Sequence, residues 1–116
     1  MMDPAPFRMA LLFLLCLAAG PAGAALRCAV PPELWDKPRS GRALAANPAL
    51  KPCLEQAALN PSARVVIRHG SRGEAPLQAE ELKGWLAALA LDPARVALAN
   101  DLGAGDDLVL EVGATK

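Results

Sequence analysis

An uncharged apolar run divides this chain of 116 residues into two unequal parts. The run covers residues 9–19 and is followed by GPAGA at residues 20–24, which ends in the small-x-small pattern of a signal-peptidase site. We expect residues 1–24 to be a secretory signal peptide and residues 25–116 to form the mature protein. A retained membrane anchor is the alternative, but eleven apolar residues fall short of the roughly 20 that span a bilayer.

The mature part has a length typical of one small domain. It contains two of the three cysteines, Cys28 and Cys53. In an oxidising compartment these two thiols have one intramolecular pairing, which we predict to be a structural disulfide. A redox-active pair is the alternative, although such pairs usually have Cys-x-x-Cys spacing. The sequence therefore predicts a periplasmic or secreted protein with no membrane span after signal cleavage.

The mature part is poor in aromatic and metal-binding side chains. It has no Met, Phe or Tyr, and its aromatic residues are Trp35 and Trp85. The core must therefore be built from Ala, Leu, Val and Ile. Since His69 is the sole histidine of the chain, we expect no metal site and no cofactor.

Apolar periodicity predicts six elements in the order β-α-β-α-β-β. The predicted strands are residues 27–34, 64–68, 95–99 and 108–112, and the predicted helices are residues 42–60 and 77–91. We expect one α+β domain, a two-layer sandwich with both helices on one face of a mixed sheet.

Proline and asparagine refine the first half of this prediction. Pro31 and Pro32 restrict the first strand to a sheet edge, because proline cannot donate to a ladder. Asn47 and Pro48 are suited to cap and begin the first helix. Pro52 would then lie inside that helix and kink it or divide it into two pieces.

The second half carries a clearer pattern. Leu82, Trp85, Leu86 and Leu89 recur at helical spacing and predict one buried stripe. Gly84 lies off this stripe, where glycine costs about 1 kcal/mol relative to alanine. The last two strands, separated by a glycine-containing loop, are predicted to form a hairpin.

The net charge is zero, but the charge is segregated along the chain. Residues 25–72 carry eight Lys and Arg against three Asp and Glu (+5), and residues 73–116 carry three against eight (−5). Two solvated faces of one domain explain this pattern. Head-to-tail self-association or an anionic partner is the alternative. We expect no nucleic acid partner, because the compartment is wrong and no aromatic residues interleave the basic ones.

The segment Arg68-His69-Gly70 is similar to the Arg-His-Gly signature of histidine phosphatases, whose histidine accepts the phosphoryl group. That family needs a second histidine, and this chain has none. Phosphate-ester chemistry at His69 is kept as an alternative. The simpler interpretation is a histidine at a strand end that packs on the same face as Val65 and Ile67.

The loop that follows this strand, residues 68–73, contains glycine and arginine. Such a loop can form a backbone nest that binds an anion. Arg68, His69 and Arg72 are therefore the candidate ligand-binding residues, and an exposed turn is the alternative. We find no catalytic constellation and expect no enzyme.

Residues 49–101 resemble the OmpA-like C-terminal domain, a family of peptidoglycan-associated periplasmic modules. Residues 61–67 (PSARVVI) look like its central strand, residues 71–73 (SRG) like the following turn, and residues 77–89 like its second helix. The resemblance implies a β-α-β-α-β core. It also implies an Asp in the loop and an Arg early in the helix, which hold diaminopimelate in that family. Here the loop has no Asp, and Glu80 and Glu81 stand where the Arg belongs.

These observations together predict an exported domain of the bacterial cell envelope with a non-catalytic binding or structural role. Its expected partner is the cell wall or an envelope protein. Peptidoglycan binding through residues other than those of the family is the alternative function.

Overall fold

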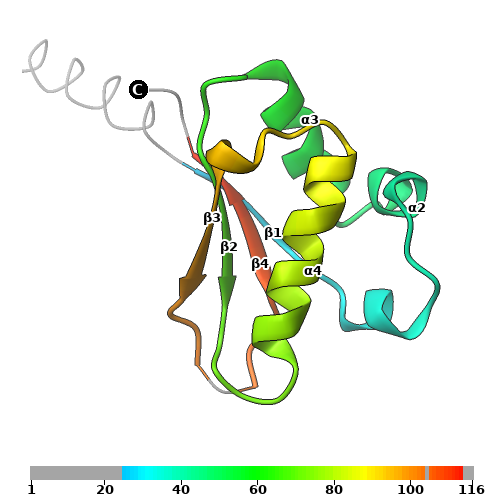
Figure 1. Cartoon of the computed structure of the whole chain (residues 1–116), viewed down its shortest axis with the longest axis vertical. Helices are drawn as coiled ribbons and strands as arrows, with labels where there is room; N and C mark the ends of the chain where they lie inside the picture. Colours follow the sequence, from blue (N-terminus) through cyan, green and yellow to red (C-terminus); the bar gives the residue numbers. More distant parts are fainter. Residues whose placement is uncertain (1–24, 104, 114–116) are drawn as a thin grey trace, which may run out of the picture.

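The computed structural model describes residues 25–103 and 105–113, and the predicted signal peptide lies outside these residues. In the described part, a four-stranded mixed sheet forms one layer and helices cover one of its faces (Figure 1). The predicted α+β class, with helices on one face of a mixed sheet, is confirmed.

Nine short elements make up this part of the chain. The strands are β1 (Leu26–Ala29), β2 (Val65–His69), β3 (Val96–Asn100) and β4 (Val109–Val112). The helices are α2 (Gly41–Ala46), α3 (Lys51–Leu59) and α4 (Ala75–Ala88), with 3-10 turns η2 (Pro32–Asp36) and η3 (Pro93–Arg95).

The strand order is β1-β4-β2-β3, so β1 lies at a sheet edge as predicted. β2 pairs with β3 in parallel and with β4 antiparallel. The predicted hairpin between the last two strands is therefore wrong, because β2 lies between them. Their connection crosses the end of β2, where the Leu102 N–H donates to the His69 carbonyl oxygen at 3.1 Å. A tight hairpin turn could not make this crossing.

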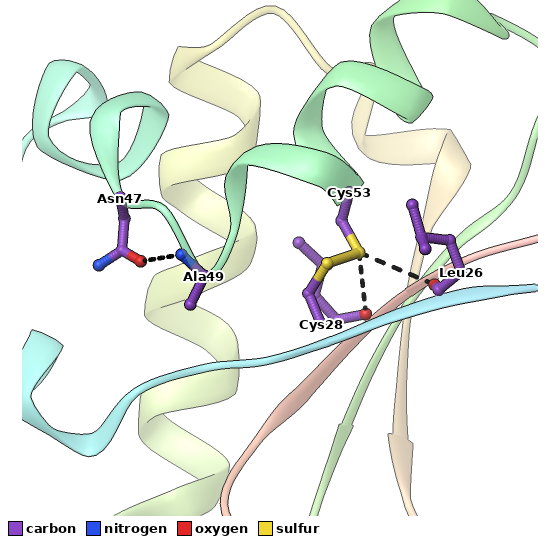
Figure 2. The surroundings of a disulfide bond; sticks show 6 residues. Leu26, Cys28, Asn47, Ala49 and Cys53 are labelled. Carbon is purple, nitrogen blue, oxygen red and sulfur yellow. Dashed lines mark hydrogen bonds between the residues drawn. A yellow bond between two sulfur atoms is a disulfide. The ribbon is translucent and has the colours of Figure 1, made fainter.

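The predicted helix over residues 42–60 is divided into α2 and α3, but Pro52 is not the cause. Asn47 ends α2, and its side-chain oxygen accepts the backbone N–H of Ala49 at 2.9 Å (Figure 2). Pro52 lies in the first turn of α3, where a helix has no partner for the missing N–H. The sequence thus predicted the division correctly and its position wrongly.

The core lies between the sheet and the helices. Val65 and Ile67 of β2 are buried against Leu82 and Leu86 of α4, which are fully buried. Trp85 is half-buried and packs at the margin of this core. Of the predicted stripe, Leu82 and Leu86 are thus fully buried, whereas Trp85 and Leu89 are partly buried.

The two cysteines connect the layers. Cys28 on β1 and Cys53 on α3 have the geometry of a disulfide, with a Cα–Cα distance of 6.2 Å (Figure 2). The carbonyl oxygens of Leu26 and Leu110 lie 3.7 and 3.5 Å from Cys53 Sγ. Because a disulfide sulfur carries no proton, these oxygens become hydrogen-bond acceptors for Cys53 only when the bond is reduced. The disulfide therefore ties the edge strand to the helix that covers it.

Candidate functional site

The structure separates two of the three predicted ligand-binding residues. Arg68 and His69 are neighbours on β2, and successive strand residues point to opposite faces of the sheet. Arg68 lies on the face without helices. Its Nε donates to Glu111 Oε1 at 2.7 Å, and its Nη1 pairs with Asp101. The hydrogen bond to Glu111 raises the pKa of Arg68 above its ordinary value, so this guanidinium is committed to partners within the protein.

His69 lies on the helix-covered face and is buried, at 6% exposure. Its Nδ1 is 2.9 Å from the carbonyl oxygen of Gly70. Since a carbonyl oxygen only accepts, Nδ1 carries the proton in this arrangement. The burial supports the interpretation of a histidine packed on the same face as Val65 and Ile67.

Arg72 is the one predicted residue that lines a cleft. The cleft has a volume of about 730 Å³ and is lined by residues of the β2–α4 and β3–β4 connections. These two connections lie at the same end of the sheet (Figure 1). The segment from Val30 to Asp36 forms its third side. Three parts of the sequence that lie far apart therefore build this site.

Backbone contacts hold the three segments together. A Cβ atom at Gly70 would lie 3.1 Å from the carbonyl oxygen of Gly103, so the two connections pack closely only because position 70 has no side chain. The Val30 N–H donates to the Leu108 carbonyl oxygen at 2.8 Å, which joins the first segment to the β3–β4 connection. In that connection, the Gly103 N–H donates to Asp106 Oδ2 at 3.1 Å.

Trp35, the aromatic residue of the cleft, is held by a cluster of Arg39, Glu81 and Trp85 that the sequence did not predict. The guanidinium of Arg39 lies 5.3 Å from the ring centre of Trp35 and donates to the Trp35 carbonyl oxygen at 3.0 Å. Arg39 also pairs with Glu81 of α4, whose carboxylate accepts the Trp85 Nε1–H at 2.9 Å. The cluster thereby anchors η2, and with it Trp35, to α4.

The sequence indicates one of the two contacts that form this cluster. Glu81 and Trp85 are four residues apart, a spacing at which helix side chains meet. Arg39 lies 42 residues before Glu81, and nothing local indicates that pairing. The hydrogen bond from Arg39 lowers the pKa of Glu81 below its ordinary value, and that from Trp85 lowers it further.

The cleft is lined by more acidic than basic side chains. The loop that contributes Arg72 is basic, but Asp36, Glu74, Asp106 and Asp107 also line the cleft. Four acidic residues and one arginine thus line the cleft. The arrangement suits recognition of a cationic group better than of an anion.

The described residues contain neither a metal-binding cluster nor a membrane-spanning helix. Among residues 25–103 and 105–113, no three His, Cys, Asp or Glu side chains are close enough to bind one metal ion. No helix in the same part of the chain has the length and apolarity needed to cross a membrane.

Comparisons with protein-family models, curated proteins and solved structures find no match to this chain.

Proposed function

We propose that this protein is an exported, non-catalytic domain of the bacterial cell envelope that binds a ligand in the cleft lined by Trp35, Arg72 and Gln78. The observation that carries the proposal is the cleft itself. A volume of about 730 Å³ with an aromatic wall and converging polar side chains is typical of small-molecule and peptide sites.

The Cys28–Cys53 pair supports the proposed compartment. Both sulfurs are buried, and disulfides of this kind persist in exported proteins and are rare in the cytosol. Cell fractionation with mass spectrometry tests this part. We expect the periplasmic or secreted fraction to contain a chain that begins near Ala25 and is lighter than the dithiol form by two hydrogens. Finding the full-length chain reduced in the cytosol would contradict the proposal.

The proposal that the domain is not an enzyme is supported by the surroundings of His69. The imidazole is buried, its Nδ1 is bonded to Gly70, and the adjacent Arg68 lies on the other face of the sheet. We expect the protein and its His69→Ala variant to hydrolyse a phosphate ester at the same background rate. Hydrolysis by the parent protein that the substitution abolishes would instead support the alternative of phosphate-ester chemistry.

Peptidoglycan is the second candidate, as a ligand of the same cleft. The OmpA-like resemblance implies a β-α-β-α-β order, and the described chain has α2 and α3 between β1 and β2, α4 between β2 and β3, and β4 after β3, which is compatible with that order. The loop that follows the central strand lines the cleft through Gly70, Arg72 and Glu74. Both observations support cell-wall binding at this place. Because the Asp and Arg of that family are missing, the contacts would have to come from other residues.

Co-sedimentation with purified cell-wall sacculi tests this candidate. Gln78 of α4 lines the cleft, whereas the adjacent Leu77 is 72% exposed and does not. Gln78→Trp should fill the cleft and reduce the bound fraction, and Leu77→Trp is the matched control that should leave it unchanged. If the two variants sediment alike, the cleft is not the wall-binding site.

A further inference from the structure

We propose that β3 pairs with β3 of a second copy of this chain, antiparallel and edge to edge, so that the two four-stranded sheets become one continuous sheet. The inference goes beyond the proposed function, because β3 contributes no residue to the lining of the cleft. It depends on the free edge of β3, on the lack of features that protect this edge, and on the order of the residues along it.

The free edge is the first observation. β3 is the last strand in the order β1-β4-β2-β3, and Figure 1 shows no other described element beyond it. Its residues pair with β2 over the whole strand, from Val96 opposite Val65 to Asn100 opposite His69. A strand that is paired on one side directs the N–H and C=O groups of alternate residues away from the sheet. The outer side of β3 can therefore accept another strand through its backbone.

The second observation is that the two edges of the sheet differ in protection. Proteins usually protect an edge strand by short length, charged side chains or proline. β1 has four residues including Arg27, and two prolines follow it closely. β3 has five residues, VALAN, and none of them is charged or proline. The side chains of Ala97, Leu98 and Ala99 are partly exposed. The sheet is thus protected at β1 and open to pairing at β3.

The third observation is the symmetry of the β3 sequence about Leu98. When two copies run antiparallel about a two-fold axis at this residue, Ala97 of one copy faces Ala99 of the other, and the two leucines face each other. Directly opposed residues have Cβ atoms about 4.5–5.5 Å apart, a distance that alanine side chains do not obstruct. The opposed leucines cover apolar surface that is partly exposed in one copy. Such a contact uses the same surface twice and closes at two copies.

The charges that flank β3 fit the same arrangement. Arg95 precedes the strand and Asp101 follows it, at equal distances along the chain from Leu98, so each Arg95 lies beside Asp101 of the other copy. Arg95 donates to three backbone carbonyl oxygens, and no carboxylate of the described residues pairs with it. The Asp101 side chain pairs with Arg68 and remains 48% exposed. Parallel pairing would instead oppose like charges, which is destabilising. The charges therefore favour the antiparallel two-fold arrangement.

Sedimentation equilibrium of the oxidised protein tests the inference. We expect a concentration-dependent equilibrium between one chain and two chains. A protein that stays monomeric up to about 1 mM, where even a very weak association is detectable, would overturn the inference. Assemblies that grow beyond two chains would also overturn it, because pairing of β3 with β1 of the next copy does not close.

Two matched lysine substitutions separate the two edges. Ala29, Val109, Arg68 and Ala99 form one row across the sheet, so Ala29 and Ala99 lie on the same face at opposite edges. Ala99→Lys adds a charge to the pairing edge and should weaken the dimer about tenfold. Ala29→Lys adds the same charge to the β1 edge and should change the dissociation constant less than twofold. Equal weakening by both variants would show that β3 is not the interface.

A second pair of variants tests the register without changing β3, so the test holds even if Ala99→Lys fails to fold. Asp101→Asn removes the contact with Arg95 of the other copy and should weaken the dimer about fivefold, because the contact occurs twice. Arg68→Gln is the control, since it removes the partner of Asp101 within the same chain and should not weaken the dimer. If Asp101→Asn dimerises like the parent protein, or if both variants weaken the dimer equally, the inferred register is wrong.

Discussion

Gly70 and Gly103, which both line the cleft, pack closely, and a Cβ atom at Gly70 would lie 3.1 Å from the Gly103 carbonyl oxygen. The contact joins the two connections that lie at the end of β2. It explains why the β2–α4 connection, which contains Arg72, and the β3–β4 connection, which contains Asp106 and Asp107, line one cleft although they lie about 30 residues apart in the chain.

Gly70→Ala should therefore destabilise the protein and displace the β3–β4 connection. The neighbouring atoms belong to backbone, so the loop itself must move, and we expect a loss of about 1–2 kcal/mol in the free energy of unfolding. Denaturant unfolding measures the loss, and backbone amide chemical shifts of residues 101–108 report the displacement. An unchanged spectrum would show that this contact does not position the loop.

Gly84→Ala is the opposite case. Gly84 lies on the exposed side of α4, and a Cβ atom there would meet no other atom within 4 Å. Alanine should stabilise the helix by about 1 kcal/mol, because it restricts the unfolded chain and favours helical geometry. A thermal melt that rises by a few degrees supports this, whereas a fall would indicate that the position needs glycine for another reason.

The Arg39–Glu81–Trp85 cluster predicts a specific pH dependence. Its hydrogen bonds lower the pKa of Glu81, so its stabilisation is present above the unfolded pKa of about 4.3 and is lost as the pH falls through the folded value. Glu81→Gln should cost about 0.5–1 kcal/mol at pH 7, since the pair is partly exposed. The difference from the parent protein should shrink below about pH 4.

Glu80→Gln is the control for that measurement. Glu80 is the exposed neighbour of Glu81, and its side chain forms no ion pair with another described residue. Its unfolding curves should follow those of the parent protein across the acid range. If Glu80→Gln and Glu81→Gln behave alike, the cluster does not stabilise the contact between η2 and α4.

Replacing both Cys28 and Cys53 with alanine should lower the free energy of unfolding by about 3 kcal/mol. The bond closes a loop with a sequence separation of 25, and the unfolded chain gains freedom when it is absent. Because the two side chains are 6% and 0% exposed, alkylating reagents with a reductant should modify them only after denaturant is added. Rapid modification of the native protein would contradict the burial of this pair.

Most strands and helices of this domain agree with local patterns, but residues 32–34, predicted as the end of the first strand, belong to the 3-10 helix η2 instead. β2 was recognisable because Val65, Val66 and Ile67 favour extended backbone, and α4 because Leu82 and Leu86 recur one turn apart. The boundary at Asn47 was misjudged because asparagine and proline fit both the end of one helix and the start of the next. Local preferences alone do not distinguish these two positions.

The α+β class, the pairing of Cys28 with Cys53 and the buried face of β2 could all be predicted from the amino-acid sequence, because they follow from local periodicity and from the number of cysteines. Tertiary contacts establish that β2 lies between β3 and β4 and that Asp36, Asp106 and Asp107 line the same cleft as Arg72. The physical reason is that strand order and charge neighbourhood depend on how connections cross the end of a sheet. Such crossings bring together residues whose separation along the chain carries no signal of their contact.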